Sequence, residues 1–134
     1  MIDIHAHILP QVDDGSPSIE CSLEMARLAV ESGVAAMIAT PHCNLPGSRQ
    51  PLWADPLTRR AQELSRVLEK RQIALRLYAG MEIFGTPDTA EKLREGKLCT
   101  LAGSRYLLIE FPFHDYGREA TQILKSVLDL GLRP

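Results

Sequence analysis

The sequence predicts an α/β fold in which parallel strands alternate with helices. Four apolar runs have the length of strands, and a segment with helical spacing of its apolar residues follows each of them. Repetition of strand and helix along a chain favours right-handed crossovers and a parallel sheet. At 134 residues the chain fits one domain of the usual length.

The first strand is expected at the N-terminus, where Ile2 and Ile4 suit a buried strand. A helix is predicted over about residues 18–32, because apolar residues recur there at helical spacing. Ser16 or Ser18 is the expected N-cap, since a serine hydroxyl can accept a hydrogen bond from a free amide of the first turn.

The remaining elements follow the same alternation. A continuous apolar run over 34–40 predicts a second strand that is covered on both faces. A long polar connection then leads to Asp55-Pro56, a favourable N-cap and first-turn pair for a helix that runs to about residue 71. Further along, the pattern predicts a strand over 73–83, a short helix over 86–96, a strand over 105–111 and a helix over 120–131.

Four such units make half of a (β/α) barrel. The chain stops at Leu132-Arg133-Pro134, where a fifth strand is expected to begin. An open half-barrel leaves two strand edges and much apolar surface uncovered, so we expect the chain to be a truncated portion of a domain and to form a homo-oligomer.

His5 and His7 carry the first chemical signal. Residues two apart on a strand point to the same side, so the two imidazoles form half of a metal site. The Asp13-Asp14-Gly15 turn can bring a carboxylate back to that point, and nitrogen with oxygen ligands suits Mn, Zn or Fe. The alternative is a strand with two hydrogen-bonded histidines and no metal.

Each later strand also ends in a residue that can bind metal. His42 follows the second strand, Glu82 lies near the end of the third, and Glu110 near the end of the fourth. Sites of (β/α) barrels gather at the carboxyl ends of the strands. We therefore expect these side chains to converge with the two N-terminal histidines.

Composition excludes several other classes of protein. The formal net charge of −2 disfavours nucleic acid and anionic membrane as partners. No apolar run approaches the length of a membrane span, and the three cysteines show no paired spacing. We expect free thiols and a cytoplasmic location, with no membrane insertion.

The chain resembles the PHP (polymerase and histidinol phosphatase) superfamily, and within it the manganese-dependent protein tyrosine phosphatases of bacterial capsule and exopolysaccharide loci. The stretches that carry the resemblance occur in family order along the whole chain. They are Met1–Pro10, Val12–Gly15, Ala39–His42, Gly80–Ile83 and Ser104–Phe111.

The resemblance implies a PHP-type distorted TIM-like barrel, of which residues 1–134 would be the N-terminal portion of a single domain. It implies two or three Mn²⁺ ions, with Zn²⁺, Fe²⁺ or Mg²⁺ as substitutes, and metal-assisted hydrolysis of a phosphomonoester. The substrate would be a phosphotyrosine protein, a bacterial tyrosine kinase of polysaccharide biosynthesis. The implied metal ligands are His5, His7, Asp14, His42, Glu82 and Glu110.

The family pattern continues past Pro134 with a metal-binding histidine, a phosphate-binding arginine and an Asp-x-His pair. Within this chain the resemblance implies no catalytic residue beyond the metal ligands. Activity of the isolated 134 residues is therefore in question, and a non-catalytic metal-binding fragment is one alternative.

Two other enzymatic interpretations remain open. A histidinol-phosphatase-like or other PHP hydrolase would keep the metals and change the substrate. A cysteine-dependent phosphatase would use Cys43 as nucleophile and Arg49 for the phosphate, because His42 to Arg49 has the H-C-x5-R spacing. Pro46 and Pro51 oppose this, since one removes an amide donor and the other interrupts the helix that should bind the anion. His114 and Asp115 follow the fourth strand, where the expected structure is a surface loop and the alternative is a position facing the substrate.

Overall fold

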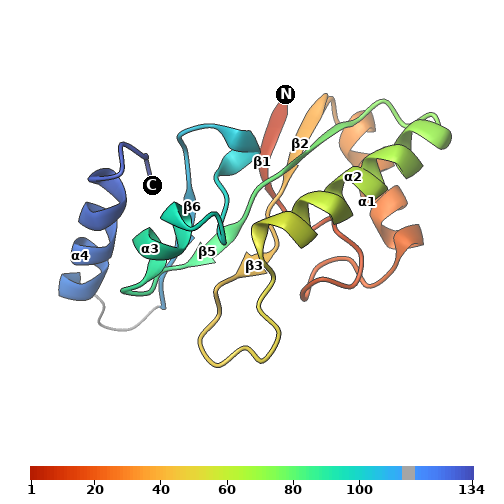
Figure 1. The fold of residues 1–134 in the computed structure, drawn as a ribbon. Helices are drawn as coiled ribbons and strands as arrows, with labels where there is room; N and C mark the ends of the chain where they lie inside the picture. The colour runs from red at the N-terminus through yellow and green to blue at the C-terminus, as the bar shows by residue number, and fades with distance from the viewer. Residues whose placement is uncertain (113–116) are drawn as a thin grey trace.

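A computed structural model describes residues 1–112 and 117–134 and shows parallel strands with helices, as the sequence predicts (Figure 1). The described strands form two three-stranded parallel sheets, in the orders β1-β2-β4 and β3-β5-β6. In chain order the elements are β1 Ile2–Ala6, α1 Ile19–Glu31, β2 Ala36–Ala39, β3 His42–Cys43, α2 Ala54–Lys70, β4 Arg76–Ala79, β5 Glu82–Phe84, α3 Thr89–Arg94, a 3-10 turn at Leu101–Gly103, β6 Leu108–Glu110 and α4 Gly117–Leu128.

The prediction of one continuous third strand over 73–83 is wrong, because that segment is split into β4 and β5, which belong to different sheets. The predicted second strand corresponds to β2, and the short strand β3 that follows it was not predicted. Pro41 separates β2 from β3, and it has no amide with which to continue the ladder. Gly80 lies between β4 and β5, and a Cβ there would be 2.7 Å from Cγ2 of Ile38. Pairing resumes where the Glu82 amide donates to the Pro41 carbonyl, 3.1 Å away.

The helix starts differ in part from expectation. Ser18 is the N-cap of α1, and its Oγ accepts from the Cys21 amide at 3.2 Å. The Asp55-Pro56 cap is wrong: α2 begins at Ala54, and its N-cap residue, Trp53, makes no side-chain capping bond. The Ala54 amide instead donates to the Lys97 carbonyl, 2.9 Å away, so a tertiary contact satisfies it.

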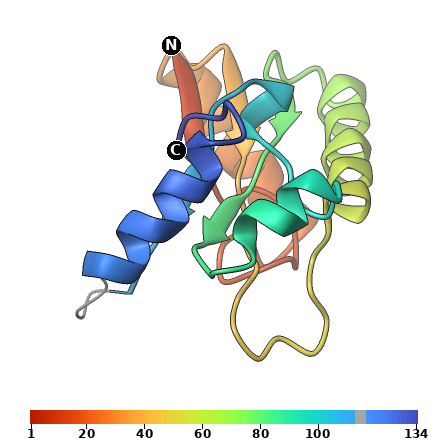
Figure 2. The same cartoon turned by 60° about the vertical axis from the view of Figure 1, so that its left-hand side comes forward.

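One apolar core joins the first sheet to its helices. Buried side chains from α1, α2, β2 and β5 belong to a single cluster, which also includes residues just beyond β1. In Figures 1 and 2, α2 and α4 lie on opposite sides of the molecule. The largest fully buried apolar side chains are Ile8, Leu9, Leu57, Leu68, Met81 and Ile83.

The first strand is less buried than the sequence predicts. Ile2 is 63% and Ile4 57% exposed, because among the described strands β1 pairs only with β2. In the second sheet the edge strand β6 pairs, among the described strands, only with β5. A single parallel bridge joins Tyr106, just before β6, to Arg133. The described part of the chain therefore keeps an open edge at β1 and an exposed apolar strip beside it.

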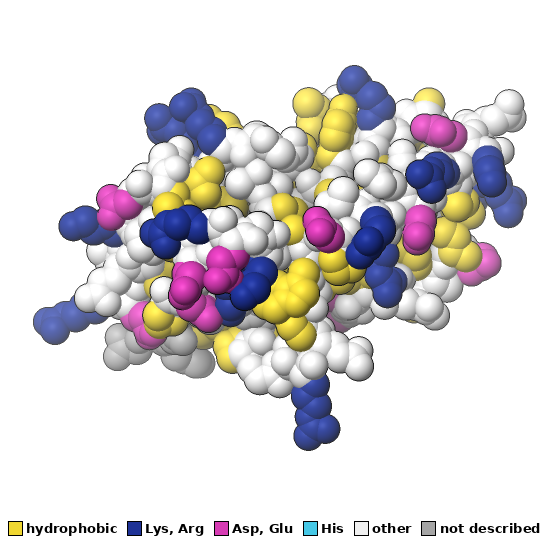
Figure 3. All heavy atoms as spheres, in the orientation of Figure 1, with side chains coloured by type: hydrophobic (Ala, Val, Ile, Leu, Met, Phe, Trp, Pro, Cys, Tyr) yellow, Lys and Arg dark blue, Asp and Glu magenta, His cyan; other side chains and the backbone are white. Residues whose placement is uncertain are grey.

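Charge is evenly mixed on the visible surface. Acidic and basic side chains alternate over the face in Figure 3, and neither sign forms a broad patch there. Among the described residues, no helix combines the length and apolarity needed to cross a membrane.

We predict that Gly80→Ala lowers the free energy of unfolding by about 1–3 kcal/mol, because the added methyl meets Ile38 and the side chain of Leu101, 3.0 Å away. Urea unfolding followed by circular dichroism measures the change. Gly117→Ala is the matched control, since a Cβ at Gly117 has no neighbour within 4 Å among the residues that the structure describes. Equal unfolding midpoints for Gly80→Ala and the wild type would contradict the close packing of Ile38 and Leu101 against Gly80.

Candidate metal centre

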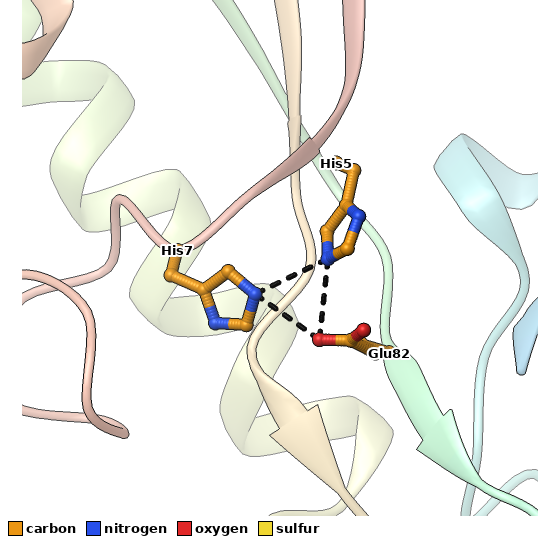
Figure 4. A group of neighbouring side chains, drawn as sticks. All are labelled: His5, His7 and Glu82. Atoms are coloured by element: carbon orange, nitrogen blue, oxygen red, sulfur yellow. Dashed lines mark hydrogen bonds and ion pairs between the residues drawn. The ribbon is translucent and has the colours of Figure 1, made fainter. Parts of the chain in front are cut away.

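Two histidines and a glutamate meet where β1 ends and β5 begins. His5 lies on β1, His7 follows its last residue, and Glu82 is the first residue of β5 (Figure 4). The Nε2 atoms of His5 and His7 are 3.2 Å apart, and Glu82 Oε2 is 3.2 Å from the first and 3.1 Å from the second. The three side chains therefore face one point.

Glu82 Oε2 is the atom that best tests whether a cation fits. It is buried, and among the described residues no donor is oriented to hydrogen-bond to it. A buried acceptor without a donor is costly, more so when it carries charge. Ligands about 2.1 Å from one metal ion lie roughly 3.0–3.4 Å from each other, which matches the spacing of these atoms. The donor set fits a divalent cation.

Asp13 orients the ring of His7. Its Oδ2 lies 2.7 Å from Nδ1 of His7, so Nδ1 donates to the carboxylate and Nε2 keeps its lone pair toward Glu82. Asp13 also accepts from the amides of Gly15 and His42, both at 3.0 Å. Burial alone would raise the pKa of Asp13, but these hydrogen bonds hold its pKa below the ordinary value.

His42 lies among three carboxylates. Its Nδ1 is 2.9 Å from Glu110 Oε1 and 3.1 Å from Glu82 Oε2, and its Nε2 is 3.6 Å from Asp14 Oδ1. Burial alone would lower the pKa of His42, but the hydrogen bond to Glu110 and the charges of Glu110, Glu82 and Asp14 raise it above the ordinary value. Positive charge is therefore favoured at this position.

The structure brings all six side chains named in the sequence analysis into three overlapping groups. In each group the ligand atoms lie within 4.8 Å of one another, and each pair of groups shares one residue. His5, Asp14 and Glu110 each occur in one group only. The groups are His5 with His7 and Glu82, His7 with Asp14 and His42, and His42 with Glu82 and Glu110.

The backbone around the N-terminal ligands is fixed by short polar contacts. Thr40 Oγ1 accepts from the Ala6 amide at 3.0 Å, which ties the end of β1 to the end of β2. Ser22 Oγ donates to the Ile8 carbonyl at 2.6 Å and contacts Ser16 Oγ at 2.7 Å. A Cβ at Gly15 would be 2.3 Å from Cβ of His7, so only glycine lets the acidic turn pack on His7.

The sequence places Asp13 in the turn but does not indicate that it holds His7. Two adjacent aspartates look alike in a sequence pattern, and only the fold shows which carboxylate faces an imidazole. The hydrogen bond from the Gly15 amide to Asp13 Oδ1, two residues back, is the one local signal. His114 and Asp115, expected in a surface loop, lie outside the described residues.

The geometry of Cys43 contradicts its use as a nucleophile. The thiol is 2% exposed, and Sγ donates to the Pro41 carbonyl at 3.3 Å. Burial raises the pKa of the Cys43 thiol well above its ordinary value, whereas a reactive cysteine needs a lowered one. Arg49 is exposed in the following loop.

An open cavity of about 350 Å³ adjoins the cluster. One part of it is lined by Val12, Asp13, Asp14 and His42, and the rest by Cys43 and the loop after β3. Apolar side chains of that loop, Leu45 and Leu52 among them, border the cavity. A substrate held there would contact both the metal-binding side chains and an apolar wall.

Comparison with known proteins gives consistent matches over the whole chain. The family described as "Capsular polysaccharide synthesis, CpsB/CapC" matches residues 1–134. Tyrosine-protein phosphatase YwqE of Bacillus subtilis is 40% identical over 134 residues, covering 100% of this chain and 52% of YwqE. Tyrosine-protein phosphatase CpsB of Streptococcus pneumoniae is 36% identical, covering 100% of this chain and 54% of CpsB.

A solved structure agrees with the sequence matches. It belongs to the crystal structures of YwqE from Bacillus subtilis and CpsB from Streptococcus pneumoniae, which are described as unique metal-dependent tyrosine phosphatases. The TM-score is 0.92 at 37% sequence identity, over 98% of this chain and 53% of that chain. The chain spans about half the length of the relatives it matches. The resemblance noted in the sequence is thus confirmed, and the chain belongs to the CpsB/CapC family of capsular polysaccharide synthesis.

Proposed function

We propose that this chain carries the metal-binding part of a protein-tyrosine phosphatase that hydrolyses phosphomonoesters with divalent cations. The observation that supports it is Glu82 Oε2, a buried carboxylate oxygen that has three imidazole nitrogens 3.1–3.2 Å away and accepts no hydrogen bond from any described residue. The relatives YwqE and CpsB are named tyrosine-protein phosphatases, and their structures are described as metal-dependent.

The proposed ligands are the six residues of the three groups. Nitrogen and carboxylate oxygen donors without thiolate suit two or three Mn²⁺ ions, and also accept Zn²⁺, Fe²⁺ or Mg²⁺. Bound cations would lower the pKa of water and hold phosphate oxygens during displacement of the leaving group.

The chain's own side chains would prepare the site for that chemistry. Asp13 keeps the Nε2 lone pair of His7 directed at the site, and Glu82 presents an acceptor shared by two groups. Asp14 is largely exposed beside the cavity, so it lies where an incoming phosphate would approach. The apolar loop wall would accommodate the substrate's tyrosine ring.

We also propose that residues 1–134 are the N-terminal portion of a single PHP domain, folded as the first half of a distorted TIM-like barrel. The main chain near Arg133 supports this, because its amide donates to the Arg105 carbonyl at 2.7 Å and its carbonyl accepts from the Leu107 amide at 2.9 Å. The chain at Arg133 thus pairs in parallel with the segment that leads into β6, which is the position that a fifth barrel strand would take.

The substrate that we propose is a bacterial tyrosine kinase of polysaccharide biosynthesis. The family's link to capsular polysaccharide synthesis supports this choice. The reaction would take place in the cytoplasm, where the three free cysteines would remain reduced.

We expect a chimera of this chain with the C-terminal half of YwqE to hydrolyse a phosphotyrosine peptide in the presence of Mn²⁺. EDTA should abolish phosphate release, while Cys43→Ser should keep most of it, because the buried thiol takes no part. His42→Ala should lower the rate by at least about 100-fold, as expected for loss of a metal ligand. Activity that survives EDTA and is lost in Cys43→Ser would reverse the assignment.

The raised pKa of His42 predicts a pH-dependent metal affinity. As the pH falls through this raised value, His42 gains a proton that a cation must displace, so Mn²⁺ affinity should weaken at a higher pH than it would for an ordinary histidine ligand. NMR titration of the His42 ring in EDTA should give a midpoint above about 6.5. Glu110→Gln should lower that midpoint by removing the adjacent charge, and an unchanged midpoint would contradict the role of Glu110.

The 134-residue chain alone is expected to self-associate and to be a poor phosphatase. Ile2 and Ile4 lie exposed on the open edge strand β1, and pairing of two copies would cover both. Light scattering coupled to gel filtration measures the mass, and Ile4→Lys should shift it toward a monomer. A wild-type monomer with full turnover would disprove both expectations.

A further inference from the structure

We propose that Asn44 is a positioning residue for the metal centre: its side chain locks β3 against β5 and so holds His42 opposite Glu82. The inference deepens the proposed function, because it concerns two of the proposed ligands. Among the described residues, the side chain of Asn44 hydrogen-bonds to Phe84, Thr86 and Lys92 and to neither of the two ligand side chains, so it acts through the pairing of the two strands.

The pairing between β3 and β5 is short. It joins His42 to Glu82 and Cys43 to Ile83, and β3 then ends. Asn44 would be the next residue in register with Phe84, but its backbone turns away in the left-handed region, with φ of 62°. The side chain of Asn44 supplies the inter-strand hydrogen bond in place of its backbone, since Asn44 Nδ2 donates to the Phe84 carbonyl at 2.8 Å.

The hydrogen bond to Phe84 is part of a closed polar ring. Asn44 Nδ2 also contacts Thr86 Oγ1 at 2.7 Å, and Asn44 Oδ1 accepts from Lys92 Nζ at 2.6 Å. The ring closes through Asp88, which accepts from Thr86 Oγ1 at 2.6 Å and pairs with Lys92 at 2.9 Å. Asn44 is only 8% exposed, so both ends of its amide are satisfied within the protein.

The chemistry of the partners fixes the orientation of this amide. Lys92 can only donate, so it faces Oδ1, and the Phe84 carbonyl can only accept, so it faces Nδ2. Asparagine meets both demands and also tolerates a left-handed backbone. An ionised aspartate would keep the bond to Lys92 and lose the bond to Phe84.

Loss of the Phe84 bond should loosen the two-residue strand β3. His42 Nδ1 is 3.1 Å from Glu82 Oε2, a spacing that the register of β3 and β5 sets. Variation in that register would spread the ligand atoms apart and weaken cation binding. Removal of residues that orient metal ligands typically costs about 10–100-fold in metal affinity.

Asn44→Gly tests the proposal with little backbone penalty, because glycine adopts positive φ readily. Two quantities are measured on the chimera with the YwqE half. The first is hydrogen exchange of the Glu82 amide in EDTA, which reports its bond to the Pro41 carbonyl. The second is Mn²⁺ affinity from competition with a fluorescent chelator. We expect exchange several-fold faster than in the wild type and affinity about 10-fold weaker.

Two further variants separate the Phe84 bond from the rest of the ring. Asn44→Asp should behave like Asn44→Gly, since it also lacks the donor to Phe84. Lys92→Met should keep wild-type exchange and affinity, because it leaves that donor in place. Val127→Ala, in the core of α4, is the control for general destabilisation and should leave Mn²⁺ affinity unchanged.

Wild-type exchange and affinity in Asn44→Gly would overturn the proposal, and so would an equal loss in Lys92→Met. A wild-type chimera that binds no Mn²⁺ would instead disprove the proposed function. The exchange measurement contains no metal, so in that case it would still decide whether Asn44 holds the two strands together.

Discussion

The parallel pairing of β3 with β5 is the constraint on which the site depends. It sets His42 opposite Glu82, and Glu82 in turn meets the imidazoles of the first strand. If β2 and β4 continued in a straight line, His42 and Glu82 would extend the first sheet and would not begin a second one. The interruptions at Pro41 and Gly80 redirect the chain, so β3 and β5 of the second sheet begin just past the carboxyl ends of β2 and β4.

Much of the fold follows from local patterns, and the divergences have identifiable causes. The alternation of apolar runs with helical spacing predicts the parallel α/β arrangement, and polar residues at the ends of runs indicate where side chains gather. The split between β4 and β5 was missed because the 73–83 run has the pattern of one strand, while the close packing of Ile38 against Gly80 is a tertiary contact. The exposure of Ile2 and Ile4 was missed for a similar reason, since an apolar strand does not say whether a partner covers it.

Two features of the site show the limits of motif spacing. Cys43 and Arg49 have the separation of a cysteine phosphatase, but desolvation of the thiol works against that chemistry. Asp13 and Asp14 are neighbours with different surroundings: one hydrogen-bonds to His7, and the other lies exposed beside the cavity. Residue type and spacing identify candidates, whereas burial and hydrogen-bond direction distinguish their roles.

The sharing of ligands among the three groups has a thermodynamic consequence. His7, His42 and Glu82 each belong to two groups, so an ion held in one group changes the charge and rotamer freedom of side chains needed by the next. Occupancies of the proposed centre are therefore linked equilibria with coupling free energies between them. A metal titration would therefore give stepwise binding constants that describe the cluster as a whole, and none of them could be assigned to one group of residues.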